Sequence, residues 1–192
     1  MELHNGENKW SRNIREQTIR LNGLMQNLLA LAKMDEGGVK LPSSDILLSS
    51  LLEEILPSFY EPASLKEIII QENIQPDIIV HGNRDNMIRL ITILMDNAVK
   101  YTESGGFIWI SVEQGEIFTK ISIKDTGKGI PLERHGTIFN RFYREPEVAD
   151  QDGVGIGLYL ARGIIMKERG FIEVRSITGK GSTFYVNLPA VQ

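Results

Sequence analysis

Three residues with side chains suited to a magnesium–nucleotide lie close together in the chain: Asn97, Lys100 and Tyr101. The stretch from 93 to 102 predicts a helix, and residues three and four positions apart on a helix are neighbours on one face. An amide oxygen is a hard ligand for Mg²⁺, an ammonium group pairs with phosphate, and an aromatic ring packs beside a base. The alternative is an ordinary core helix whose polar residues face solvent. Apolar residues at helical spacing form a core stripe on the same segment: Met87, Leu90, Ile91, Leu94 and Ala98.

Two glycine-rich stretches downstream favour the nucleotide hypothesis. Asp125 ends an apolar strand pattern and is followed by Gly127 and Gly129, so its carboxylate could accept a hydrogen bond from an exocyclic amine such as that of adenine. Asp-x-Gly-x-Gly by itself is equally consistent with a capped surface turn. The second stretch, 153–157, precedes a predicted helix whose N-terminal amides could bind phosphate, although it lacks the Lys-Ser/Thr of a P-loop. The alternative there is a tight helix entry.

Taken in order, these segments resemble those of a known family. Residues 95–102 resemble the N box, 125–131 the G1 box, 138–144 the F box, and 153–158 the G2 box of sensor histidine kinases of two-component systems. Residues 181–184 are similar to the family's last strand. More broadly, the chain resembles the superfamily that shares this ATP-binding fold with gyrase, a heat-shock chaperone and mismatch-repair ATPases. The resemblance covers residues from about 10 to 189.

The resemblance implies a role for each matching residue. Asn97 would coordinate Mg²⁺, Lys100 would contact phosphate and Tyr101 would flank the adenine of ATP. Asp125 would read the adenine amine, and Arg144, at the start of a lid over 144–152, would reach the terminal phosphate. Further residues of these segments would line the nucleotide: Gly127, Gly129, Ile130, Phe139, Phe142, Gly153, Gly155, Ile156, Gly157, Leu158 and Thr183.

The chain also departs from the family pattern. The family's H box, which carries the phosphoacceptor histidine, would precede residue 10, and this sequence does not contain it. His4, His81 and His135 lack the H-box context and are interpreted as surface or structural histidines. One turn before Asn97 the family usually carries Asn, and its ATPase relatives carry Glu, whereas this chain has Ile93. An aliphatic side chain can neither activate water nor hold Mg²⁺, which argues against an ATP hydrolase.

The fold class expected is α+β: a two-layer α/β sandwich of the Bergerat type, with a mixed sheet of about five strands and three helices on one face, preceded by a long N-terminal helix. The resemblance implies that residues 1–36 are part of the family's dimerisation and phosphoacceptor hairpin and that 39–192 form the catalytic ATP-binding domain. A seam from Ile14 to Leu31 favours partner helices for the first segment; the alternative is a helix docked on its own domain. The first helix is expected at 10–36. A second would be capped by Asp45, with Pro57 and Pro62 bracketing its end, and a third would run from a cap at Asn83 to about 101. A short helix is expected through 138, 139 and 142, and a last one from the glycines of 153–157 to about 169. Strands are expected at 39–41, 67–73, 77–81, 107–114, 117–124, 171–176 and 182–188.

The composition limits which classes of partner the chain is expected to have. The 192 residues carry a net charge of -4 with no basic stripe, so nucleic acid is not expected, and no apolar run is long enough to span a membrane. Cysteine is absent, which excludes thiol catalysis and disulfides. The resemblance implies a homodimer in the full-length protein, a response-regulator receiver domain as partner, and a cytoplasmic location, with membrane attachment only through upstream segments. A nucleotide-binding regulatory module without phosphotransfer is the alternative function, and Ile93 supports it.

Overall fold

The computed structural model describes residues 42–143 and 155–191, together with residues 10, 14, 18, 21 and 25. The chain divides into two compact units, Met1–Val39 and Lys40–Gln192. In the first unit the five described residues are helical, and the Thr18 hydroxyl donates to the carbonyl of Ile14 at 2.7 Å. The rest of the helix predicted over 10–36 and the strand predicted at 39–41 lie outside the described residues. No described helix is long and apolar enough to cross a membrane.

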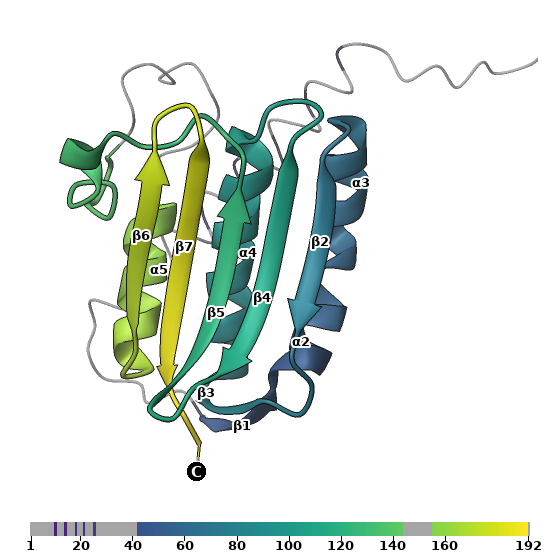
Figure 1. Ribbon diagram of the computed structural model, residues 1–192. Coiled ribbons are helices and arrows are strands. Elements are labelled where there is room, and N and C mark those ends of the chain that lie inside the picture. The colour runs from purple at the N-terminus through teal and green to yellow at the C-terminus, as the bar shows by residue number, and fades with distance from the viewer. Residues whose placement is uncertain are drawn as a thin grey trace, which may run out of the picture. The chain divides into compact units, whose positions relative to one another are not determined.

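The second unit is built on a mixed five-stranded sheet with the strand order β2-β4-β5-β7-β6 (Figure 1). Its strands are β2 (Ile69–Ile74), β4 (Phe107–Gln114), β5 (Phe118–Asp125), β6 (Phe171–Ile177) and β7 (Gly181–Pro189). β2 runs parallel to β4, and the other three pairings are antiparallel. The mixed sheet expected from the sequence is therefore confirmed, and β2 and β6 form its two edges.

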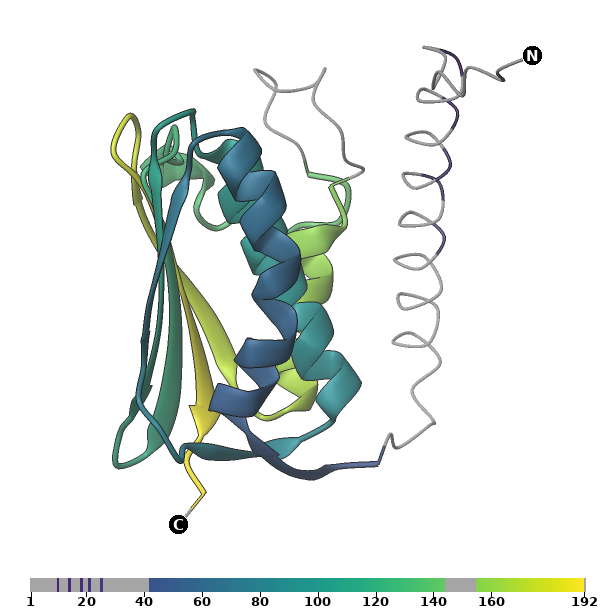
Figure 2. The ribbon, with the colours of Figure 1, turned by 90° about the vertical axis from the view of Figure 1, so that its right-hand side faces the viewer.

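Helices cover one face of this sheet and leave the other face open (Figure 2). They are α2 (Leu48–Ile55), α3 (Pro57–Leu65), α4 (Arg84–Tyr101) and α5 (Gly157–Lys167). The strands alternate accordingly: Ile108, Ile110 and Val112 of β4 are fully buried toward the helices, while the residues between them remain half-buried on the open face. The core stripe predicted on α4 is confirmed, because all of its apolar members are buried.

The segment before α4 differs from expectation. Asp45 does not cap a helix; it lies in β1 (Ser44–Leu47), which pairs antiparallel with β3 (Ile79–Gly82) in a separate two-stranded sheet. That partner is distant in sequence, so a local cap pattern cannot reveal it. Helix α2 ends at Ile55, just before Pro57 as predicted, but Pro57 also begins α3, where its missing N–H is unneeded, and Pro62 lies inside α3. The described part of the second unit therefore has four α-helices where three were expected.

The prediction of a short helix through 138, 139 and 142 is also wrong. A 3-10 turn occupies Leu132–Arg134, and a series of tight turns follows it to Phe142, which has a positive φ of 63°. The hydrogen bonds here mostly span three residues, such as Asn140 N–H to the carbonyl of Thr137 at 2.9 Å, so no α-helical ladder develops.

Helix α4 carries the candidate site, and both of its ends are anchored. At its start the side-chain oxygen of Asn83 accepts from the N–H of Asn86 at 3.0 Å, which confirms the predicted cap. At its end the Lys66 ammonium donates to the carbonyls of Val99, Lys100 and Thr102 at 2.8, 3.1 and 3.2 Å. A cation at a helix C-terminus is favourable because it neutralises the partial negative charge of the last carbonyls.

We expect Lys66→Met to lower the free energy of unfolding by about 1–3 kcal/mol, because methionine keeps the apolar stem but leaves three carbonyls without their donor. Urea unfolding followed by tryptophan fluorescence measures the loss. Lys180→Met is the control: Lys180 is exposed in the hairpin between β6 and β7, and its removal is expected to change stability by less than about 0.5 kcal/mol. Equal stability of both variants would contradict the anchoring role of Lys66.

Candidate nucleotide-binding site

The trio identified in the sequence lies near the C-terminal end of α4. Asn97, Lys100 and Tyr101 are all half-buried, whereas Leu94 and Ala98 point into the core. The trio therefore sits at the boundary between the core and solvent, where a ligand can be reached. The Lys100 ammonium lies 5.1 Å from the centre of the Tyr101 ring, within the range of a cation–π interaction.

Asp125 is the last residue of β5 and is almost fully buried, with 5% of its surface exposed. Its Oδ1 atom accepts hydrogen bonds from the backbone N–H of Gly127 at 2.8 Å and of Ser182 at 3.2 Å. Burial raises the pKa of this carboxyl, and the two backbone hydrogen bonds oppose that rise in part. Both bonds use Oδ1, so the second oxygen retains its capacity to accept a hydrogen from a ligand.

The glycine turn after Asp125 lies directly against the end of α4. A Cβ at Gly127 would come within 2.3 Å of the Tyr101 carbonyl oxygen, so only glycine permits this approach. Gly129 has a φ of +71°, and a Cβ there would lie 2.0 Å from the carbonyl oxygen of Ile177. The turn is thus held between the backbone carbonyl of Tyr101 at the end of α4 and the β6–β7 hairpin.

A pair of serines fixes the exit of this turn. The hydroxyl of Ser176 accepts from the N–H of Ile130 at 2.7 Å and lies 2.9 Å from the hydroxyl of Ser182. Ser176 comes from β6 and Ser182 from β7, so two strands distant in sequence position both the carboxylate and the turn. A rigid acceptor of this kind can select a ligand by its hydrogen-bond donors.

Lys128, in the same turn, places a second ammonium beside Tyr101. Its nitrogen lies 5.0 Å from the centre of the ring, is buried, and has no hydrogen-bond partner among the residues that the structure describes. A buried ammonium without an acceptor is costly, and an anionic ligand would relieve that cost. The sequence analysis did not single out Lys128, because a lysine in a turn is ordinarily a solvated residue.

The remaining candidate residues lie along the segment before α5. Phe139 is buried and packs edge-on against Phe184 with ring centres 6.5 Å apart, whereas Phe142 is 55% exposed. Gly155 approaches the carbonyl of Tyr143 so closely that a Cβ would lie 2.4 Å from the oxygen. Ile156 is buried, and Gly157 and Leu158 are half-buried in the first turn of α5.

The start of α5 lies beside α4. A Cβ at Gly157 would stand 3.4 Å from Cγ2 of Ile93, the residue one turn before Asn97. Glycine-bearing backbone at the start of α5 therefore comes close to the helix that carries the trio. Arg144 and Gly153, with the predicted lid over 144–152, lie outside the described residues.

The structure does not bring Thr183 to this group. Along β7, Ser182, Phe184 and Val186 face the helices, so Thr183 faces the open side of the sheet. The β7 residue that contacts Asp125 is instead Ser182, whose N–H donates to the carboxylate, and the sequence analysis did not identify it. Period-two alternation counted back from the apolar Phe184 could have identified it.

These features fit an adenine nucleotide. The buried acceptor of Asp125, the space that a Cβ at Gly127 would fill and the unpaired Lys128 ammonium offer an amine acceptor, a close backbone approach and a cation. No group of three or more His, Asp or Glu side chains that could hold a metal occurs among the described residues. A Mg²⁺ ion would therefore depend on few protein oxygens, which is usual for magnesium bound with nucleotide phosphates.

Comparison with known families agrees with this geometry. Residues 82–192 match the family described as histidine kinase-, DNA gyrase B- and HSP90-like ATPase. The chain therefore belongs to this family, and it is an ATP-binding domain of the sensor histidine kinase type. The resemblance noted from the four boxes is confirmed.

The similar proteins include a sensor protein and a histidine kinase of known structure. The chain is 32% identical over 176 residues to the sensor protein SrrB of Staphylococcus aureus, covering 91% of this chain and 30% of that protein. Two solved structures share the fold. The nucleotide-free catalytic domain of histidine kinase ThkA has a TM-score of 0.71 at 24% identity, covering 79% of this chain and all of that one. ThkA in complex with the response regulator protein TrrA has a TM-score of 0.76 at 22% identity, and the match covers 100% of this chain and 53% of that one.

Proposed function

We propose that the chain binds Mg²⁺·ATP and donates its γ-phosphoryl group to a histidine on an upstream helix that the sequence lacks, as the catalytic part of a two-component sensor histidine kinase. The observation that supports this most strongly is the buried Asp125, whose carboxylate is fixed by the backbone amides of Gly127 and Ser182. In a chain of this family, a buried acceptor fixed in this way suits the amine edge of adenine.

We assign the roles that the family resemblance implies. Asp125 accepts from the adenine amine, and the Tyr101 ring packs along the base. Lys100 and the amides at the start of α5 face the phosphates, with Arg144 at the terminal one. Asn97 would hold a Mg²⁺ ion, which would neutralise charge on the transferring group.

Phosphoryl transfer then requires an imidazole nitrogen to form a bond to the γ-phosphorus while the bond to the β–γ bridging oxygen breaks and ADP leaves. This chain's residues bind and orient the donor; the acceptor comes from the helix hairpin. Partners are accordingly a second copy of the full-length protein and a receiver domain. The complex of ThkA with TrrA supports the latter. We place this reaction in the cytoplasm.

A regulatory module that binds nucleotide without phosphotransfer is the second candidate. Ile93 favours it, because this residue is only 9% exposed and packs where α4 meets the start of α5. No oxygen ligand stands one turn before Asn97. Phosphate transfer to a supplied acceptor distinguishes the two functions.

Base selection tests the proposed site directly. In Asp125→Asn the amide oxygen must remain on the N–H groups of Gly127 and Ser182, so its NH₂ faces the base. We expect ATP affinity to fall by about 1–3 kcal/mol, roughly 5- to 150-fold, because two donors then face each other. The affinity of the same variant for inosine triphosphate, which carries a carbonyl in place of the amine, should fall less or should rise. Calorimetry with both nucleotides measures the change, and equal affinity of the unmutated chain for both would contradict the role of Asp125.

The same carboxyl predicts a pH dependence. Accepting from the amine requires the ionised form, and burial raises the pKa of Asp125 above its ordinary value of 3.8. As pH falls toward the raised pKa, the free protein takes up a proton that ATP must displace, so affinity should fall at a higher pH than for an ordinary aspartate. Asp125→Asn should lack this dependence. Identical pH profiles for the two proteins, after correction for phosphate protonation, would count against the assignment.

A further inference from the structure

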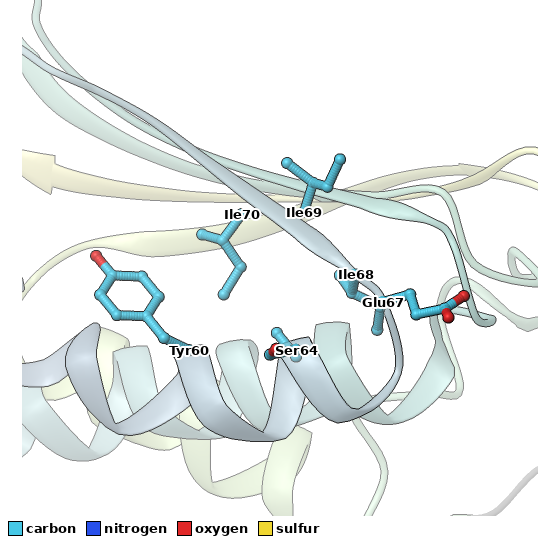
Figure 3. A pocket seen from close by; sticks show the side chains of 7 residues that line it. Tyr60, Ser64, Glu67, Ile68, Ile69 and Ile70 are labelled. Carbon is cyan, nitrogen blue, oxygen red and sulfur yellow. The ribbon is translucent and has the colours of Figure 1, made fainter.

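A cavity of about 390 Å³ lies at one edge of the sheet, between α3 and β2 (Figure 3). Its wall is mostly apolar, and it is lined by Tyr60, Ala63, Ser64, Glu67, Ile68, Ile69 and Ile70. Neither α4 nor the glycine turns contribute to it, so it is separate from the proposed nucleotide site.

The strand beside this cavity has an unpaired edge. Among the described strands, β2 is first in the sheet order and pairs with β4 alone. The N–H of Ile69 bonds to the carbonyl of Gly106 at 3.0 Å, and that of Gln75 to Val112 at 3.1 Å. Backbone groups alternate along a parallel ladder, so those of Ile70, Glu72 and Ile74 point away from β4. An open row of donors and acceptors next to an apolar cavity is the arrangement that accepts an added strand.

The mouth of the cavity is acidic. Glu67 is the one charged residue among those that line it, and the nearby Lys66 directs its ammonium to the end of α4. Glu67 has a positive φ of 57° at the end of α3, where glycine is the usual residue. Its carboxylate accepts a hydrogen bond from the Ser104 hydroxyl at 3.3 Å and remains exposed to solvent. The Tyr60 hydroxyl donates to the carboxylate of Glu72, and this hydrogen bond ties α3 to β2.

We infer that the groove between α3 and β2 binds an extended segment of a partner protein, which adds a strand to the free edge of β2. Every second side chain of that segment would face the cavity, so these positions are apolar. A lysine or arginine at the segment's end pairs with Glu67, because the lining offers a negative charge and no competing cation. The inference does not depend on nucleotide binding, since no residue is shared with that site.

The test uses the whole chain and a fluorescent capped peptide of sequence Lys-Val-Thr-Val-Thr-Val-Lys, titrated by fluorescence anisotropy. Saturable binding is expected, with at least about tenfold weaker binding of the matching peptide that carries Glu at both ends. Ser64→Trp fills the cavity and should weaken binding about tenfold or more. Ser111→Trp is the matched control, because Ser111 lies in β4 on the face of the sheet without helices.

Charge reversal supplies a readout that a purely structural effect would not move. Glu67→Lys should exchange the preference, favouring the Glu-ended peptide, while Glu67→Gln should bind both peptides alike. Circular dichroism and thermal unfolding confirm that the variants fold. The inference is overturned if the unmutated chain does not bind the Lys-ended peptide, or if Ser64→Trp binds as Ser111→Trp does. It is also overturned if sedimentation shows that a second copy of the chain occupies the edge instead.

Discussion

Incubated with ATP labelled at the γ-phosphate, the 192-residue chain is expected to incorporate no phosphate, although it binds the nucleotide. Its described imidazoles are engaged elsewhere. Nδ1 of His81 lies 2.9 Å from Oδ1 of Asp45 in the β1–β3 pair, and Nε2 of His135 lies 3.1 Å from the carbonyl oxygen of Ile130. Neither belongs to a helix that could present it to a γ-phosphate. His4 lies outside the described residues.

Joining the chain to an upstream helix that carries an acceptor histidine should produce a dimer and an acid-labile phosphohistidine. Positioning converts a bound nucleotide into an effective donor, and effective molarities in such systems can exceed about 10⁵ M, so the expected contrast is between label and none. The extended chain with Asn97→Ala is the control for a donor without its metal ligand.

Two results would change the proposal. Label on His4, His81 or His135 of the present chain would place the acceptor here rather than upstream. An extended chain that dimerises and binds ATP tightly but never labels would support the regulatory module, with Ile93 as the first residue to examine.

Asn97→Ala should remove the Mg²⁺-dependent part of ATP affinity. Ile93 provides no oxygen one turn away, so Asn97 is the expected side-chain ligand on its face of α4. We expect affinity in Mg²⁺ to fall by about 100-fold or more and to match the affinity measured in EDTA. The fold should persist, because Asn97 is half-buried and alanine is the better helix former.

Calorimetry with and without Mg²⁺ measures this loss. Thr92→Ala is the matched control: Thr92 is a half-buried polar residue of the same helix that lies outside the proposed face. Unchanged Mg²⁺·ATP affinity in Asn97→Ala would rule out the metal role. A loss that persists in EDTA would show that Asn97 acts on the nucleotide instead.

Local chemistry determined much of what could be read before the structure. The Asn83 cap and the apolar spacing of α4 predicted that helix almost to the residue, because capping and helical periodicity act over three or four positions. Alternation placed β4 and β5 in the same way. The order of the four boxes identified the family, since each box depends on glycines or polar residues at short, fixed spacing.

The tertiary structure decided what depends on partners far along the chain. Asp45 had the type of a helix cap but pairs with His81 in a strand ladder, because β3 supplies an edge that no local signal encodes. Ser182 reaches Asp125 across 57 positions through the register of β7 on β5. Lys66 caps a helix end more than 30 positions away. Such contacts follow from strand register and helix packing, which are collective properties of the folded chain, whereas side-chain periodicity and backbone preference are written in each short segment.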